Sequence, residues 1–69
     1  MNRFTDDADI WRAAQLMLDQ YGDDAPLQAA QRADQLIEDG DAQGGAVWRQ
    51  ILGAIEELRR ERREDEAIN

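Results

Sequence analysis

Apolar residues in this chain recur at the spacing of amphipathic helices, in three segments that two glycine-bearing breaks separate. The breaks are Tyr21-Gly22-Asp23-Asp24 and Asp39-Gly40-Asp41. No segment shows the apolar–polar alternation of a half-buried strand. The pattern therefore predicts helices over about residues 6–21, 25–39 and 42–62. Since short connections favour antiparallel neighbours, we predict an all-α fold, a small antiparallel three-helix bundle.

Capping residues mark the predicted helix ends. The candidate N-caps are Thr5 or Asp6 for the first helix, Asp23 or Asp24 for the second, and Asp41 for the third. Pro26 falls in the first turn of the second helix, where its missing N–H costs nothing. Gly40 is the predicted end of that helix, because glycine readily adopts the left-handed conformation that follows many helices.

A helical wheel predicts which side chains face the core. The inward residues are Ile10, Trp11, Ala14, Met17, Leu18 and Tyr21 in the first helix; Ala29, Ala30, Ala33, Leu36 and Ile37 in the second; and Gly44, Val47, Trp48, Ile51, Leu52, Ile55 and Leu58 in the third. The third helix has the widest apolar sector, which makes it the predicted central element. The small alanines of the second helix leave space that we expect Trp11 and Trp48 to fill.

The chain of 69 residues is long enough for one domain, predicted over residues 1–63. Residues 64–69 form a charged end that we expect to fray. No cysteine is present to cross-link the fold, so a small apolar core must hold it together.

The net charge of −8 is concentrated in residues 1–45, which carry ten acids and three arginines. Such a surface is repelled by nucleic-acid phosphates and by anionic membranes, so neither is an expected partner. No apolar run approaches the ~18 residues that a bilayer requires, and the N-terminal residues lack a signal-peptide core. We therefore expect a soluble cytoplasmic protein.

Several short motifs give the chain a familiar appearance. They are Asp9-Ile10-Trp11-Arg12-Ala13-Ala14, Ala29-Ala30-Gln31-Arg32-Ala33-Asp34, Gly40-Asp41, and Val47-Trp48 followed by Ile51, Ala54-Ile55 and Leu58. Over about residues 8–60 the chain resembles a family of short bacterial proteins of unknown function. The resemblance implies a self-contained domain in a bacterial cytoplasm. Its motifs are core and cap residues, so it transfers no catalytic or binding residue.

Reactive side chains are scarce. The chain has no histidine, cysteine, serine or lysine, and only Thr5 and Tyr21 offer hydroxyl nucleophiles. Catalysis near neutral pH would then require carboxylates with raised pKa values, which need burial or close pairing, yet the acids lie on predicted polar faces or in breaks. We predict that the chain is not an enzyme, with no catalytic residue, no cofactor, no metal and no small-molecule substrate.

Two charged stretches admit a functional interpretation but favour a structural one. Residues 39–44 resemble the start of a calcium loop, yet the twelfth position is Gln50 rather than a bidentate glutamate. A helix end followed by a helix cap accounts for Gly40 and Asp41 without an ion. The cluster Arg59–Arg63 suits the C-terminal end of a helix and ion pairs with Glu56 and Glu57 better than a phosphate contact.

Two leucines fall outside the predicted apolar faces. Leu16 and Leu27, together with Ala13, would form a partner patch if their helices bring them together. The leading hypothesis is therefore a small non-catalytic protein-interaction or regulatory module, whose partner is another protein or a second copy in a homodimer. The alternative is an acidic decoy or antagonist of a basic or nucleic-acid-binding protein. Its negative face would comprise Asp19, Asp23, Asp24, Asp34, Glu38 and Asp39. A calcium- or substrate-binding catalyst is the least favoured class.

Overall fold

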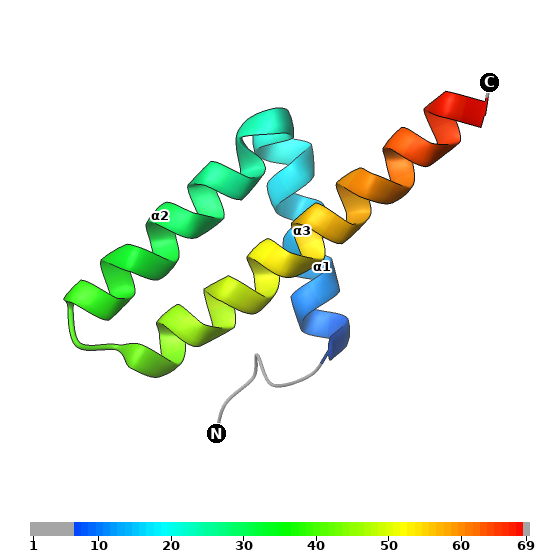
Figure 1. Cartoon of the computed structure of the whole chain (residues 1–69). Coiled ribbons are helices and arrows are strands. Elements are labelled where there is room, and N and C mark those ends of the chain that lie inside the picture. Colours follow the sequence, from blue (N-terminus) through cyan, green and yellow to red (C-terminus); the bar gives the residue numbers. More distant parts are fainter. Residues whose placement is uncertain (1–6, 69) are drawn as a thin grey trace.

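The computed structural model describes the backbone of residues 7–68 and the side chains of residues 7–61. The elements are α1 (Asp7–Tyr21), the short 3-10 helix η2 (Gly22–Asp24), α2 (Ala25–Glu38) and α3 (Ala42–Ile68) (Figure 1). Within residues 7–68 there is no strand, so the predicted all-α class is confirmed. The candidate caps Thr5 and Asp6 lie outside the described residues, as do the side chains of the tail 64–69, whose fraying stays a prediction.

The helix bounds agree closely with the prediction except at the end of α3. The bounds of α1 and α2 differ from those predicted by at most one residue, whereas α3 continues to Ile68. Figure 1 shows the last turns of α3 projecting beyond α1 and α2. The predicted end near residue 62 was wrong because it assumed that the highly charged residues at the end of the chain leave the helix, whereas arginine and glutamate are themselves good helix formers.

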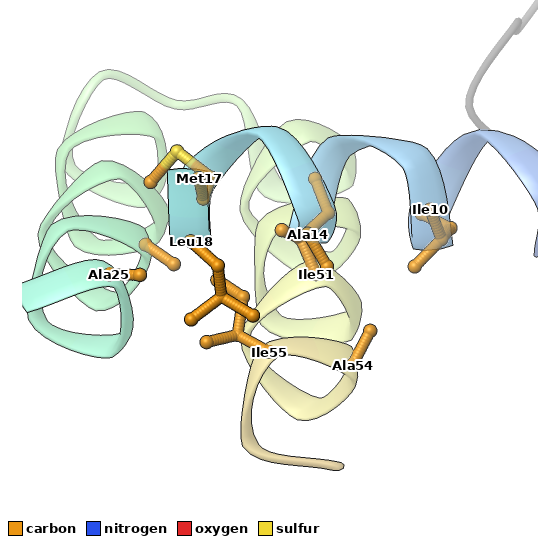
Figure 2. Close-up of a cluster of buried hydrophobic side chains, with 9 residues drawn as sticks. Ile10, Ala14, Met17, Leu18, Ala25, Ile51, Ala54 and Ile55 are labelled. Atoms are coloured by element: carbon orange, nitrogen blue, oxygen red, sulfur yellow. The ribbon is translucent and has the colours of Figure 1, made fainter. Parts of the chain in front are cut away.

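The helices are arranged as an antiparallel pair crossed by a third helix. α2 and α3 run side by side in opposite directions, and α1 crosses α3 at a steep angle (Figures 1 and 2). α3 packs extensively against both α2 and α1, whereas α1 and α2 make far fewer contacts with each other. α3 thus contributes to both helix–helix interfaces, and a groove is left where α1 crosses it.

The core is small and rich in alanine. The buried apolar residues are Ile10, Ala14, Met17, Leu18, Ala25, Ala29, Ala33, Ile51, Ala54 and Ile55. Figure 2 shows Leu18 of α1 and Ile55 of α3 pointing toward each other beside Ala25. Val47, Trp48, Leu52 and Leu58 pack around this cluster and stay partly exposed. The alanines let the helices approach closely, and Ile51 and Ile55 of α3 are the largest side chains that are fully buried.

Three residues predicted to face the core are instead exposed: Trp11, Tyr21 and Ile37. Trp11 follows Ile10 and points about 100° away from it around the helix axis. Ile10 is buried, whereas Trp11 lies at the edge of the buried face of α1. Tyr21 is the last residue of α1, next to the turn at Gly22. The expectation that Trp11 fills the space beside the alanines was therefore wrong.

The end of α2 is a Schellman motif centred on Gly40. The Asp41 N–H donates to the Leu36 carbonyl at 2.8 Å, and the Gly40 N–H donates to the Ile37 carbonyl at 3.1 Å. Gly40 has a φ of 91°, in the left-handed region that only glycine adopts readily. This geometry confirms the prediction that Gly40 ends the helix.

The start of α2 differs from the prediction in one respect. Pro26 lies in its first turn as predicted, and Asp24 occupies the N-cap position, but Asp24 makes no side-chain capping hydrogen bond. Its φ of −83° and ψ of −6° are helical, because η2 runs directly into α2. A capping side chain needs the extended backbone that precedes an ordinary helix start, so the predicted cap does not form here.

Asp41 is the N-cap of α3, as predicted. Its Oδ1 accepts a hydrogen bond of 2.8 Å from the backbone N–H of Gly44. We expect Asp41→Ala to lower the free energy of unfolding by about 1 kcal/mol, because an N–H of the first turn loses its acceptor. Asp41→Asn keeps an acceptor oxygen and should cost much less. Urea denaturation of the two variants followed by circular dichroism tests this, and equal losses would contradict the capping role.

Candidate partner-binding surface

The described carboxylates are arranged as surface and capping groups. None of the buried residues is polar or charged within the described side chains. In the same part of the chain there is no group of three or more histidine, cysteine, aspartate or glutamate residues that could hold a metal ion. In the stretch that resembles a calcium loop, Asp41 caps α3 instead. None of the helices described is both long and apolar enough to cross a membrane.

Two arginines of α3 make ion pairs at the surface. Arg60 pairs with Glu57 at 3.5 Å, as predicted, whereas Arg59 reaches Asp23 of η2 at 3.7 Å. Arg62 and Arg63 lie outside the described side chains. Pairs of this kind contribute at most about 1 kcal/mol each, so the cluster adds little to stability. Both arginines of the cluster whose side chains are described form ion pairs with acids, which supports the structural interpretation of this cluster.

The structure places the predicted patch residues on two helices. Leu16 on α1 and Leu27 on α2 are 58% and 54% exposed, which confirms that both lie off the buried faces. Ala13 is only partly exposed and packs against the core cluster. That the three residues form one continuous patch stays a prediction. Single exposed leucines are common, so exposure by itself does not define a site.

A groove between α1 and α3 is a site that the sequence analysis did not identify. It has a volume of about 460 Å³ and is lined by Asp7, Ile10 and Trp11 of α1 and by Gln50, Gly53, Ala54 and Glu57 of α3. We call it the Trp11 groove. Ile10 and Ala54 are buried and form its apolar base, while Trp11 is 42% exposed. The groove lies where α1 crosses α3 (Figure 1).

Gly53 keeps one side of the Trp11 groove open. It lies in the interior of α3, where glycine costs about 1 kcal/mol relative to alanine. A Cβ atom added at Gly53 would meet nothing within 4 Å, so the fold does not require glycine at this position for space. Gly53, a glycine in the middle of the predicted third helix, was the one signal in the sequence that could have indicated the groove.

A second groove lies between α2 and α3 and has a different character. Its volume is about 380 Å³, and its lining residues are Gln28, Gln31, Arg32, Gln35, Leu36 and Trp48. The Arg32 guanidinium carbon lies 5.2 Å from the centre of the Trp48 ring, a cation–π contact. Arg32 thus already covers a face of Trp48, whose indole also packs against the core. Four of its six lining residues are glutamine or arginine, and Arg32 already lies over the indole that would form its apolar surface.

The chain was also compared with known proteins. No protein-family model, no curated protein and no solved structure matched it. The surfaces that indicate a function are the exposed apolar residues of α1 and α2 and the Trp11 groove.

Proposed function

We propose that this chain is a small, non-catalytic protein-interaction or regulatory module of the bacterial cytoplasm. The observation that carries the proposal is the exposure of five large apolar side chains on a domain of this size. They are Trp11, Leu16, Tyr21, Leu27 and Ile37, each at least 40% exposed. Leaving large apolar surface in water is unfavourable, and a partner that covers it gains about 25 cal/mol for each Å² buried.

The domain that presents these side chains is proposed to be a three-helix bundle organised around α3. The contacts of α3 with both α1 and α2 support this arrangement. On such a scaffold Leu16 and Leu27 lie on two different helices, and with Ala13 they form the proposed partner patch. The partner of this patch is another protein or a second copy of the chain.

A substitution at Leu16 tests the proposal. We expect Leu16→Asp to break a homodimer seen by size-exclusion chromatography with light scattering, or to abolish capture of a cytoplasmic partner by the immobilised chain. A buried aspartate in an apolar contact would be desolvated without a partner. Gln15→Asp is the matched control, because it adds the same charge at the neighbouring exposed position of α1. A concentration-independent monomer that captures no partner through Leu16 would contradict the Leu16 patch.

An acidic antagonist of a basic protein is the second candidate. All six carboxylates of its proposed negative face are exposed, which favours this alternative. It differs from the patch proposal in what binding requires: capture of a basic partner would survive Leu16→Asp and would weaken steeply with added salt, since exposed charges are screened within about 10 Å at 0.1 M.

A further inference from the structure

We propose that the Trp11 groove binds an amphipathic helix of a partner protein, with arginine or lysine residues flanking a large apolar side chain. The inference deepens the proposed interaction function and rests on it. It assigns a surface on α1 and α3 that is distinct from the patch of Ala13, Leu16 and Leu27, and it specifies the chemistry of the partner.

The base and wall of the groove are apolar. Ile10 and Ala54 are almost fully buried at its base, and the indole of Trp11 stands beside them with 42% of its surface in water. The groove, of about 460 Å³, is shallow and open to solvent, so an apolar side chain of a partner would lie against Ile10, Ala54 and Trp11 without being enclosed by them. Tryptophan is among the residues that contribute most to binding when a partner covers them. An apolar side chain is therefore the expected occupant of the groove.

The shape of the groove favours a helix as the element that carries this side chain. Two crossing helices leave an angular space, and a third helix fills such a space by placing its side-chain ridges between theirs. A glycine at a helix contact lets a neighbouring helix approach closely, as Gly45 does inside this fold, where Ile37 of α2 packs against it. At Gly53 the equivalent space is empty.

Charge at the rim of the groove favours a basic partner. Asp7 lines it on α1 and Glu57 on α3, and the exposed Glu61 lies one helical turn beyond Glu57. Arg60 pairs with Glu57 at 3.5 Å, an exposed contact that a partner's arginine can replace at little cost. The whole chain carries a net charge of −8, so an acidic partner would be repelled on approach.

A substitution at Gly53 can fill the groove without destabilising the fold, so it tests directly whether a partner binds there. Gly53→Met would place a side chain in open space and would raise helix propensity, so its thermal midpoint should not fall below that of the wild type. The same side chain would occupy the position of the proposed partner helix. Trp11→Ala removes the apolar wall instead. Leu16→Asp leaves the groove intact and serves as the control.

The experiment is a display selection of randomised helical peptides of about 18 residues, five helical turns, on the full chain. We expect the selected peptides to carry arginine or lysine beside large apolar residues. Their affinity should fall by about tenfold or more in Gly53→Met and in Trp11→Ala, and by less than about twofold in Leu16→Asp. Binding should also weaken as salt rises from about 0.05 to 0.5 M, because the rim charges are exposed.

Several results would overturn the inference: no peptide recovered, no excess of basic residues, or affinity unchanged by Gly53→Met and Trp11→Ala. Peptides lost in Leu16→Asp and retained in Gly53→Met would overturn the groove assignment and leave the interaction function standing. Light scattering tests whether a second copy of the chain, rather than a basic partner, occupies the groove. If Gly53→Met converts a wild-type dimer into a monomer, a second copy occupies the groove and the basic partner is excluded.

Discussion

Leu18→Ala is expected to lower the free energy of unfolding by about 2–5 kcal/mol, the cost of deleting most of a buried leucine side chain. Leu18 is 6% exposed and meets Ile55 of α3 in the centre of the core (Figure 2). The surrounding alanines have no side-chain atoms that can move in to fill the cavity. A domain of this size has a net stability of only a few kcal/mol, so the variant should be largely unfolded at 37 °C.

Leu16→Ala is the matched control, because it removes the same atoms from the same helix two residues earlier. Leu16 is 58% exposed, so its loss should change the free energy of unfolding by no more than about 0.5 kcal/mol. Urea denaturation at 25 °C, followed by circular dichroism at 222 nm, measures both variants. Comparable losses in the two would mean that Leu16 is as buried as Leu18 and would remove the basis of the proposed patch.

The helical class and the helix ends could be predicted because they depend on local chemistry. Gly40 ends α2 because its φ is positive, and Asp41 caps α3 because an aspartate oxygen reaches the N–H three residues on. Neither interaction depends on how the helices pack. The cap at Asp24 failed because η2 joins α2 without a break, and the geometry of such a junction is not encoded in one residue type.

Burial at the edges of the apolar faces could not be predicted, because it depends on the crossing of the helices. The wheel placed Ile10 and Trp11 together on the inward face of α1, which is correct only if the helix lies along its neighbours. α1 instead crosses α3, so Ile10 is buried and Trp11 borders an open groove. The opposite error also occurred: Ala25 and Ala54 are buried although they were not among the predicted core residues.

The candidate site was predictable to the same limited extent. The exposure of Leu16 and Leu27 follows from their angular positions on single helices, and the structure confirms it. The Trp11 groove requires residues of α1 and α3 that are about forty or more positions apart in the sequence to meet, and periodicity carries no information about such contacts. Gly53 was a usable clue, because an unexplained glycine in a helix interior indicates close approach or open space.

Gly45→Ala is expected to lower the free energy of unfolding by about 1–2 kcal/mol, although alanine is the better helix former. Gly45 is buried where α3 meets α2. An added Cβ would lie 2.5 Å from Cγ1 of Ile37 and 3.2 Å from the carbonyl oxygen of Ala33. Ile37 can rotate away, but the Ala33 oxygen belongs to the backbone of α2, so the two helices must separate. That loss of packing outweighs the gain in propensity of about 1 kcal/mol.

Gly53→Ala makes the same substitution in the same helix, where the new methyl group would meet nothing within 4 Å. It should raise the free energy of unfolding by about 1 kcal/mol. The changes in stability caused by Gly45→Ala and Gly53→Ala should therefore have opposite signs. Repeating Gly45→Ala in an Ile37→Ala background separates the two contacts: the penalty should shrink once Cγ1 is gone, and the part that remains reports the Ala33 carbonyl. A gain in stability from Gly45→Ala as large as that from Gly53→Ala would show that α2 and α3 do not pack closely at Gly45.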